Sequence, residues 1–402
     1  MTATLEAPAV TTTARVSLLD LDRAAKLLRV TLPSRPIARE TGGIRVTGRA
    51  GVVSLESFDY ATGGRVLSRM DGDDFGPVVL EGRALLDAFK AAGLGVRAVA
   101  RVTADVTLTV PADGPVQVHG PNGAQPTVAR MHIDPDNLPD LPAVVGPSVT
   151  VDGDKLTRAA GAVAAGASRD VTLPLLSGAR VTFTADTVQM VTTDRYRLHE
   201  ATVPASPMST ADLPADVLLP AVLLHKLVKL VPAGEDVTVV VSVRDTRDVW
   251  ARLSWPGADV LLLSIDGDYP AVDRLWPDNP PHTAVVDRAA LLAAVKTVQP
   301  FCERNMPVRL DFGIDCLTVH NGDTEAPMSA APVQAGVQVD GMDGVAFNPS
   351  FLVDALEALD GPTVTLHMSD QVRQGAAFVL KPVEFTDGGP ARVLLVPIRF
   401  GG

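Results

Sequence analysis

The sequence contains few cysteines and few aromatic residues. Its 402 residues include two cysteines, Cys302 and Cys316, and only 4% Phe, Trp and Tyr. The cysteines are too far apart for a Cys-x-x-Cys pair and lack a His-rich partner set, so we expect reduced thiols and no metal site. Hydrophobic residues make up 46% of the chain, mainly Val, Ala and Leu. The cores should therefore be aliphatic layers of helix and sheet.

An excess of positive charge is also lacking. The formal net charge is −12, whereas proteins that hold nucleic acid over a broad surface use clustered Lys and Arg. Any contact with DNA must therefore be local. No apolar run approaches the ~18 residues of a membrane helix, and residues 1–14 lack the apolar core of a signal peptide. We expect a flexible N-terminal extension over residues 1–14 and a cytoplasmic protein that does not bind membranes.

Motifs for catalysis and cofactor binding are missing as well. The sequence has no GxSxG elbow, no GxxxxGK[ST] loop and no GxGxxG between a strand and a helix. Asp-Gly-Asp occurs at 71–73, 152–154 and 266–268. The first copy has Phe75 and Gly82 where a calcium loop needs oxygen ligands, which favours simple turns. We expect no catalytic activity, no cofactor and no metal.

One pattern of helices and strands occurs three times. Helical apolar spacing follows Asp20, Asp154 and Asp287, each placed to cap a helix. Two β-rich runs and a second amphipathic helix follow each time, at intervals of about 130 residues. The paired runs are Ile44–Val46 with Val52–Leu55, Val181–Phe183 with Val188–Val191, and Val308–Phe312 with Leu317–Val319. The second helices are Glu81–Ala92, Pro220–Leu230 and Pro349–Leu359.

Proline-rich segments separate the three copies. They lie at Pro135–Pro147 and Pro277–Pro281, where proline stiffens the connection and excludes helix and central strand. The sequence therefore predicts an α+β fold of three repeated domains at residues 15–144, 147–277 and 283–402. Each domain should pack two helices on antiparallel sheets.

A short stretch near the middle of the chain predicts a hairpin. Val191–Leu198 reads as a strand end, a turn at Asp194 and a return strand, because Thr, Val and Tyr favour strands and Asp favours turns. Two arginines flank Tyr196. This mixture suits the lip of a groove, and the alternative is an ordinary solvated hairpin.

Several segments carry a family resemblance. Thr193–Leu198 is similar to the TDxxRL signature in the middle domain of bacterial sliding clamps, the beta subunits of DNA polymerase III. Asp266–Pro277 resembles their DGxFPxYxxxxP segment, Phe347–Leu352 their FNxxYL helix start, and Val396–Phe400 their MPxRL tail. The resemblance spans nearly the whole chain beyond the N-terminal extension.

Two further segments agree with it. Ser34–Pro36 matches a loop of the family's first domain, and Ser168–Leu175 resembles the version seen in actinobacterial clamps. The resemblance implies a head-to-tail homodimeric ring with helices lining a central hole. Double-stranded DNA would pass through the hole irrespective of sequence, and the ring would be a non-catalytic processivity factor. Partners would be the DNA polymerase III alpha subunit, the clamp loader and other proteins with clamp-binding motifs.

A closed ring reconciles DNA binding with the acidic composition. Topology holds such a ring on DNA, so it needs little affinity for phosphate. The candidate DNA-facing cations are Arg35, Arg83, Lys90, Arg169, Lys296 and Arg304. The alternative for each is a solvated surface residue. Asp354, Glu357 and Asp360 on the last predicted helix argue against a uniformly basic lining.

The resemblance also implies a peptide-binding groove between the middle and last domains. Carried over residue by residue, its walls are Leu175, Val191, Thr193, Arg195, Tyr196, Arg197, Leu198, Pro270, Arg274, Leu275, Leu394, Val396, Pro397, Ile398 and Arg399. The aliphatic residues would form an apolar floor and the arginines a polar rim. A peptide that buries two or three aliphatic anchors gains about 1.5–3 kcal/mol per side chain before ordering costs, which leaves roughly micromolar affinity.

Departures from the family pattern keep other functions open. Val396 and Ile398 replace methionine-rich positions and Phe400 replaces leucine, which predicts a groove shaped for altered peptides. The alternatives are a diverged second clamp, resistant to an inhibitor or carried by a mobile element, and a β-rich scaffold protein that does not bind DNA. For the dimer, the position of the strands predicts that Thr127–Met131 of one chain pairs with Ala326–Val333 of its partner, although Pro327 and Pro332 would limit ladder hydrogen bonds.

Overall fold

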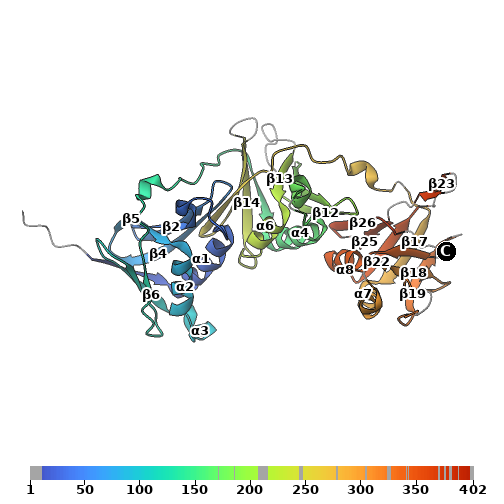
Figure 1. Ribbon diagram of the computed structural model, residues 1–402, viewed down its shortest axis with the longest axis horizontal. Coiled ribbons are helices and arrows are strands. Elements are labelled where there is room, and N and C mark those ends of the chain that lie inside the picture. The colour runs from blue at the N-terminus through green and yellow to red at the C-terminus, as the bar shows by residue number, and fades with distance from the viewer. Residues whose placement is uncertain are drawn as a thin grey trace, which may run out of the picture. The chain divides into compact units, whose positions relative to one another are not determined.

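The computed structural model has an α+β fold in which all named strand pairs are antiparallel (Figure 1). It describes residues 11–170, 172–184, 186–206, 216–243, 248–277, 279–303, 306–323, 327–340, 342, 344–369, 372–374, 377–379, 383–387 and 389–398. The chain divides into two compact units. Unit 1 contains the described residues up to Gly153 together with Lys229–Ser264. Unit 2 contains Asp154–Val228 and the described residues from Ile265 onward.

Unit 1 is built on one large sheet. Its strands are β1 (Thr12–Ser17), β2 (Gly43–Arg49), β3 (Val52–Phe58), β4 (Thr62–Gly72), β5 (Phe75–Glu81), β6 (Asp105–Val110), β7 (Val116–His119), β8 (Thr127–Val128), β9 (Ser148–Asp152), β14 (Asp236–Val243), β15 (Val249–Trp255) and β16 (Ala258–Leu263). The helices are α1 (Leu18–Thr31), α2 (Gly82–Ala92) and α3 (Ala98–Arg101), with 3-10 turns at Arg39–Gly42 and Pro135–Asn137. The main strand order is β8-β7-β6-β1-β4-β16-β15-β14-β9, and β2, β3 and β5 branch from β4.

Helices α1 and α2 of unit 1 bury their apolar faces, whereas the short helix α3 has no buried residue. Leu85, Leu86 and Phe89 of α2 are fully buried, as their spacing predicts. Glu81 caps α2 by accepting the backbone N–H groups of Arg83 and Ala84, which satisfies donors that have no partner inside the helix.

Asp20 is not the cap of the first helix, contrary to the sequence prediction. Helix α1 begins earlier, at Leu18, and the Ser17 hydroxyl accepts from the backbone N–H of Asp20. The carboxylate of Asp20 accepts a hydrogen bond from the Ser68 hydroxyl instead, at 2.8 Å. Serine and aspartate are equally good caps, so the sequence alone does not distinguish these two starts.

Unit 2 contains the second large sheet. Its strands are β10 (Gly178–Phe183), β11 (Thr187–Thr193), β12 (Arg197–Pro204), β13 (Asp216–Pro220), β17 (His282–Asp287), β18 (Val308–Phe312), β19 (Cys316–Asn321), β20 (Val333–Gln338), β21 (Gly344–Phe347), β22 (Thr363–Met368), β25 (Val383–Thr386) and β26 (Ala391–Leu395), and β23 (Val372–Gln374) pairs with β24 (Ala377–Val379) separately. The helices are α4 (Gly153–Gly166), α5 (Pro174–Ser177), α6 (Ala221–Val228), α7 (Arg288–Val298) and α8 (Pro349–Ala358), with 3-10 turns at Asp273–Leu275 and Gln299–Phe301. The sheet order is β13-β10-β11-β12-β26-β25-β22-β17-β20-β19-β18-β21.

The helix starts in unit 2 agree only partly with the sequence prediction. Asp287 caps α7 by accepting from the backbone N–H of Ala290 at 2.7 Å, as predicted. Asp154 lies inside the first turn of α4, because the helix already begins at Gly153. Asn348 caps α8, with Pro349 at its first position, where the missing N–H costs nothing.

A backbone hydrogen bond recurs at equivalent places in the three copies of the pattern. The bonds run from Met131 to Val79, from Ile265 to Leu218 and from Ile398 to Ala346, at N···O distances of 2.9, 2.7 and 2.7 Å. In each copy the acceptor lies three residues before the start of the second helix, α2, α6 or α8. The predicted pairs of β-runs also lie in adjacent strands each time, β2 with β3, β10 with β11 and β18 with β19.

Neighbouring copies are joined by strand pairing. The last strand of the middle copy, β16, pairs with β4, and Val260 lies opposite Gly64. The last strand of the third copy, β26, pairs with β12 in the same way, and Val393 lies opposite His199. The expected middle repeat, residues 147–277, therefore contributes β9, β14, β15 and β16 to unit 1 and its remaining elements to unit 2.

Candidate functional site

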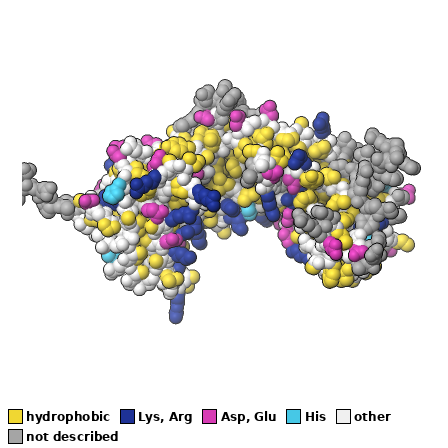
Figure 2. Space-filling model, in the orientation of Figure 1, with side chains coloured by type: hydrophobic (Ala, Val, Ile, Leu, Met, Phe, Trp, Pro, Cys, Tyr) yellow, Lys and Arg dark blue, Asp and Glu magenta, His cyan; other side chains and the backbone are white. Residues whose placement is uncertain are grey.

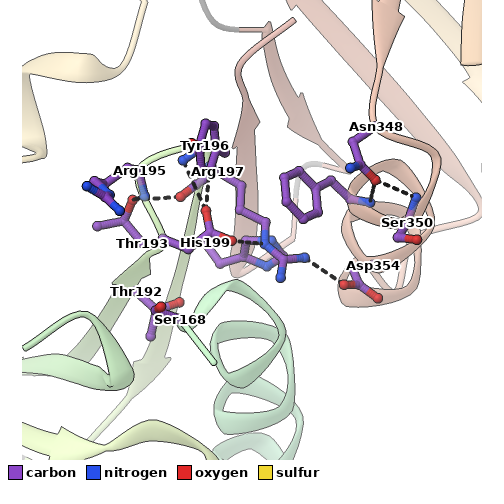
Figure 3. A network of polar contacts seen from close by, with 12 residues as sticks. Ser168, Thr192, Thr193, Arg195, Tyr196, Arg197, His199, Asn348, Ser350 and Asp354 are labelled. Carbon is purple, nitrogen blue, oxygen red and sulfur yellow. Dashed lines mark hydrogen bonds and ion pairs between the residues drawn. The ribbon is translucent and has the colours of Figure 1, made fainter. Parts of the chain in front are cut away.

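The hairpin that the sequence predicts at Val191–Leu198 is present in unit 2 (Figure 3). Strand β11 ends at Thr193 and β12 begins at Arg197. The Asp194 carboxylate accepts from the backbone N–H groups of Tyr196 and Arg197, at 3.0 and 3.1 Å. The Thr193 hydroxyl donates to the carbonyl of Arg197 at 2.7 Å. These bonds fix a tight turn in which Arg195 has a φ of 80°, in the left-handed region.

Arg197 is buried and does not lie at the rim where the sequence places it. Only 4% of its side chain is exposed. Its Nε donates to Asp194 at 2.8 Å and its Nη1 to Asp354 of α8 at 2.6 Å. The guanidinium also lies 4.3 Å from the centre of the Phe351 ring, within cation–π range. Arg197 therefore holds the hairpin against α8 rather than offering free donors to a ligand.

The predicted apolar floor comes together as a closed cluster. Val191, Leu198 and Leu394 are buried with Val272, and Tyr269 and Trp276 pack against them. Thr193 and Pro397 are also buried. Residues 269–276 of the same chain therefore cover Val191, Leu198 and Leu394. These deeper residues of the predicted groove form a buried core beneath its surface.

The remaining predicted groove residues form a surface above this cluster. Leu175 and Ile398 are half-buried, whereas Arg195, Tyr196, Pro270, Arg274, Leu275 and Val396 are exposed. The backbone N–H of Val396 donates to the carbonyl of Tyr196 at 2.9 Å, which holds the C-terminal tail beside the hairpin. Arg399 lies outside the described residues.

Residues that the sequence analysis did not single out hold the 269–276 segment in place. Arg180 donates to Asp273 at 2.6 Å, and this hydrogen bond holds the pKa of the Asp273 carboxyl below its usual value. Arg392 stacks over the Trp276 ring at 3.9 Å. Burial raises the pKa of Tyr269 to about 12. Arg180 and Arg392 lie far from this segment in sequence and carry no motif, so no local signal could identify them.

A cleft of about 560 Å³ opens beside the hairpin. It is lined by Ala167, Ser168, Arg169, Asp170, Leu173, Asp194, Arg195, Tyr196, Arg197, Gln299, Ser350, Phe351, Val353 and Asp354. Four of these were predicted site residues: Arg195, Tyr196 and Arg197 as groove residues, and Arg169 as a DNA-facing cation. The α8 residues and Leu173 were missed, because their proximity to the hairpin depends on tertiary packing.

His199 lies beneath this hairpin and makes the stability of unit 2 sensitive to pH. Its ring is fully buried, and Nδ1 lies 2.8 Å from the carbonyl of Ala162. Burial, helped by the charge of Arg197, lowers the pKa of His199 to about 3. Below pH ~6.5 the unfolded chain therefore binds a proton that the folded chain does not.

We expect unfolding free energy to fall by up to about 1.4 kcal/mol per pH unit from this group between pH ~6.5 and ~3. Urea denaturation at pH 7 and pH 4.5 measures the loss. In His199→Gln, which retains a donor for Ala162, this part of the pH dependence should disappear. Equal pH dependence in both proteins would contradict the assignment.

The predicted DNA-facing cations of unit 1 are exposed. Lys and Arg side chains gather over α1 and α2 (Figure 2). Arg35, Arg83 and Lys90 are exposed, and Arg83 donates to the carbonyl of Ser34 at 2.7 Å, so it fixes the loop that carries Arg35. In unit 2, Arg169 is exposed and Lys296 is paired with Glu357 at 2.6 Å. Arg304 lies outside the described residues.

Within the described part of the chain, no group of three or more His, Cys, Asp or Glu side chains is placed to hold a metal ion. No helix there is long and apolar enough to cross a membrane.

Known proteins resemble this chain in both sequence and structure. The family patterns described as DNA polymerase III beta subunit, central domain and C-terminal domain match residues 150–271 and 273–384. The beta sliding clamp of Micrococcus luteus is 32% identical over 75% of this chain and 92% of its own length. That of Streptomyces coelicolor is 29% identical over 92% of this chain and 95% of its own length.

A further relative is the beta sliding clamp homolog GriR of Streptomyces muensis, which is 28% identical over 92% of this chain and 94% of its own length. Among solved structures, the C. crescentus beta sliding clamp superposes with a TM-score of 0.81 at 18% identity, covering 97% of this chain and 99% of that one. The identity and coverage of the Micrococcus relative decide the assignment, and the structural match agrees with the fold. The chain belongs to the beta sliding clamp family, the beta subunits of DNA polymerase III.

Proposed function

We propose that this chain is a DNA sliding clamp, two copies of which close head to tail into a ring around double-stranded DNA. The ring tethers the DNA polymerase III alpha subunit, the clamp loader and other proteins that carry clamp-binding motifs. It works in the cytoplasm and has no catalytic activity of its own. The observation behind this proposal is that strands of neighbouring repeats pair with each other at two places within the chain, β16 with β4 and β26 with β12. We call each such pairing a join.

The two internal joins predict where a third join forms. In the two joins within the chain, residues 258–262 pair with β4 and residues 391–395 pair with β12. These segments end three residues before Ile265 and Ile398. The equivalent segment before Met131 is 124–128, and β8 ends its sheet at an open edge. Val118 of β7 and Gly120, just after that strand, donate their backbone N–H groups to the carbonyls of Pro126 and Ala124. The backbone groups of Gln125 and Thr127 therefore face outward.

The open edge therefore differs slightly from the Thr127–Met131 edge that the sequence predicts. It extends further toward the N-terminus, to residue 124. Met131 donates its backbone N–H to Val79, so this end of the predicted edge is already engaged with β5.

In the third repeat, the segment equivalent to β4 and β12 lies at residues 327–331 in unit 2. Asn321 donates to the carbonyl of Met328, and Ala330 donates to that of Val319, so the backbone groups of Ser329 face away from β19. We propose that 124–128 of one chain pairs with 327–331 of its partner. Two such joins close a ring of two chains with three repeats each, at residues 15–144, 147–277 and 283–402.

Exposed apolar residues beside each open edge support this pairing. Asn122 donates to the carbonyl of Leu94 at 2.9 Å, and Leu94 is largely exposed. The side-chain amide of Asn321 donates to the carbonyl of Phe301, a residue that is 54% exposed. Apolar surface next to an unpaired edge is costly in a monomer and favourable in a dimer. Light scattering at micromolar concentration should therefore give twice the chain mass of 42.1 kDa, and a monomer would count against the ring.

We also propose that partner peptides dock on the exposed surface above the buried cluster, with Tyr196 as an anchor. Tyr196 is 58% exposed, and the centre of its ring lies 6.4 Å from that of the Phe351 ring. Truncation to Tyr196→Ala should weaken a clamp-binding peptide by about tenfold, the effect of losing one aromatic contact of ~1.4 kcal/mol.

Fluorescence anisotropy with a labelled peptide from the alpha subunit measures this loss. Tyr60→Ala provides a matched control, because Tyr60 is 55% exposed but lies in unit 1. Equal affinity in the wild type and Tyr196→Ala would remove Tyr196 from the docking surface.

A further inference from the structure

We infer that a cleft of about 430 Å³ in unit 1 binds a peptide segment in which an aliphatic side chain stands next to an acidic one. The cleft lies at the join of β4 with β16, the first join along the chain. All the residues that line it belong to unit 1. The inference goes beyond the proposed function, because it concerns neither ring closure nor the surface around Tyr196.

The cleft is not the counterpart of the proposed docking surface. At the first join, the counterpart of the 193–197 hairpin is the turn from β3 to β4. There the Asp59 carboxylate accepts from the backbone N–H groups of Ala61 and Thr62 at 3.1 and 2.6 Å. The cleft is lined by residues 66–69, further along β4. Since a strand rises by about 3.3 Å per residue, the cleft lies roughly 15–20 Å along the strand from this turn.

The two joins share their backbone pairing but differ in side chains at the cleft. The backbone N–H of Leu67 donates to the residue before β16, and that of Thr202 donates to the residue before β26, both at 2.9 Å. Leu67 and Thr202 are therefore equivalent, and two residues later Arg69 of β4 corresponds to Pro204 of β12. The first join thus has an aliphatic and a cationic side chain where the second join has threonine and proline.

The second join also closes the equivalent space with a side chain of its own. The Asp387 carboxylate, in the turn before β26, accepts from the backbone N–H groups of Asp360 and Gly361 at 2.8 and 2.6 Å. The first join cannot form this bridge. The turn before β16 has two residues and no carboxylate, and the place of Asp360 relative to the helix start is taken by Pro232, which has no N–H. The cleft is therefore a feature of the first join.

An aliphatic side chain matches the apolar wall of the cleft. Leu67 is 42% exposed although β4 lies inside the sheet, and Leu230 and Pro232 are half-buried beside it. A ligand that covers Leu67 removes apolar surface from water. Trp255 also lines the cleft but is only 8% exposed, so it offers no free face on which a nucleic acid base could stack.

The charged side chains that line the cleft are Arg23, Arg69 and Asp20, which leave one positive charge in excess. Asp20 is already engaged, by the Ser68 hydroxyl at 2.8 Å and by Arg23 at 3.8 Å. Arg69 is exposed, and its guanidinium forms no hydrogen bond or ion pair with any residue that the structure describes. One carboxylate matches this excess and can accept a paired hydrogen bond from a guanidinium. A nucleic acid strand carries a charge on every nucleotide and needs several free cations.

Fluorine NMR of the full-length chain labelled with 5-fluorotryptophan tests the site. Of the three tryptophans, Trp255 lines the cleft, Trp276 packs beneath the proposed docking surface and Trp250 lies in the core of unit 1. Replacing each with phenylalanine assigns its signal. The probes are the peptide N-acetyl-Gly-Leu-Asp-Gly-amide and its analogue with Asn in place of Asp. Only the Trp255 signal should shift, and the Asp peptide should bind about fivefold more tightly, as expected for one contact with an exposed cation.

Two substitutions separate the charged contact from the apolar one. Arg69→Gln should bring the ratio of the two dissociation constants to about one. Leu67→Thr, which introduces the residue type of the second join, should weaken both peptides by about threefold and keep their ratio. Arg49→Gln is the control, because Arg49 is an exposed cation of β2 outside the cleft, and it should bind as the wild type does. Unchanged Trp250 and Trp276 signals show that the variants are folded.

Three results would overturn the inference directly: no saturable shift of the Trp255 signal, equal affinity of the wild type for both peptides, or a preference for Asp that survives in Arg69→Gln. A shift of the Trp276 signal alone would place the peptide elsewhere and overturn it too. Displacement of the Asp peptide by a single-stranded oligonucleotide, dependent on Arg69, would assign the cleft to nucleic acid instead. A separate titration with the alpha-subunit peptide, observed at Trp276, tests docking at Tyr196, so the two proposals can fail independently.

Discussion

Replacing Arg197 with alanine should destabilise unit 2 by about 3–5 kcal/mol, the usual cost of removing one partner from a buried ion pair. The side chain is 4% exposed and bridges Asp194 and Asp354. Its loss leaves two carboxylates facing each other without a cation and removes the contact with Phe351. Arg197 also links β12 to α8, so its loss should loosen the hairpin that forms the proposed docking surface.

Hydrogen exchange of the β11 and β12 backbone amides measures this local stability. Arg15→Ala is the matched control, because Arg15 pairs with Asp71 on the surface, where both side chains are more than half exposed. Such exposed pairs contribute about 0–1 kcal/mol. If Arg197→Ala changed amide protection as little as Arg15→Ala does, the buried network would not support the hairpin.

Replacing Phe301 with aspartate should weaken the proposed dimer by about 100-fold or more, since a charge would replace an apolar anchor at an interface. Hydrogen bonds of Asn321 link Phe301 to the edge at 327–331, and Phe301 is 54% exposed. Dilution followed by analytical ultracentrifugation gives the dissociation constant.

Ile314→Asp is the control for this substitution. Ile314 is 89% exposed and lies at the β18–β19 turn, at the other end of that hairpin from Asn321. It should leave the dimer intact. Equal dissociation constants for wild type and Phe301→Asp would place the contact between chains elsewhere.

The sequence predicts the repeating elements well because they depend on local patterns. Helix α2 shows this, since the spacing of Leu85, Leu86 and Phe89 gives its buried face directly. The turn at Asp194 is likewise local, because its carboxylate accepts from the backbone N–H groups of Tyr196 and Arg197.

The site could be predicted only in part because its packing joins distant residues. Arg195 and Arg197 look alike in sequence, yet one is exposed and the other buried. The difference comes from Asp354, which lies 157 residues beyond Arg197 in the chain. For the same reason, the sequence does not reveal that Val272 and Trp276 pack on Val191, Leu198 and Leu394, the predicted floor of the groove.

Retention on circular DNA tests the ring most directly. The protein is loaded onto a nicked circular plasmid, separated from free protein in high salt, and the plasmid is then cut once. A ring held by topology stays on the nicked circle and slides off the linear product, although the local sequence and phosphate contacts are unchanged. The account predicts stable retention before cutting and rapid loss afterwards. Loss at the same rate from the circular and the linear DNA would contradict it and would favour a scaffold protein that does not encircle DNA.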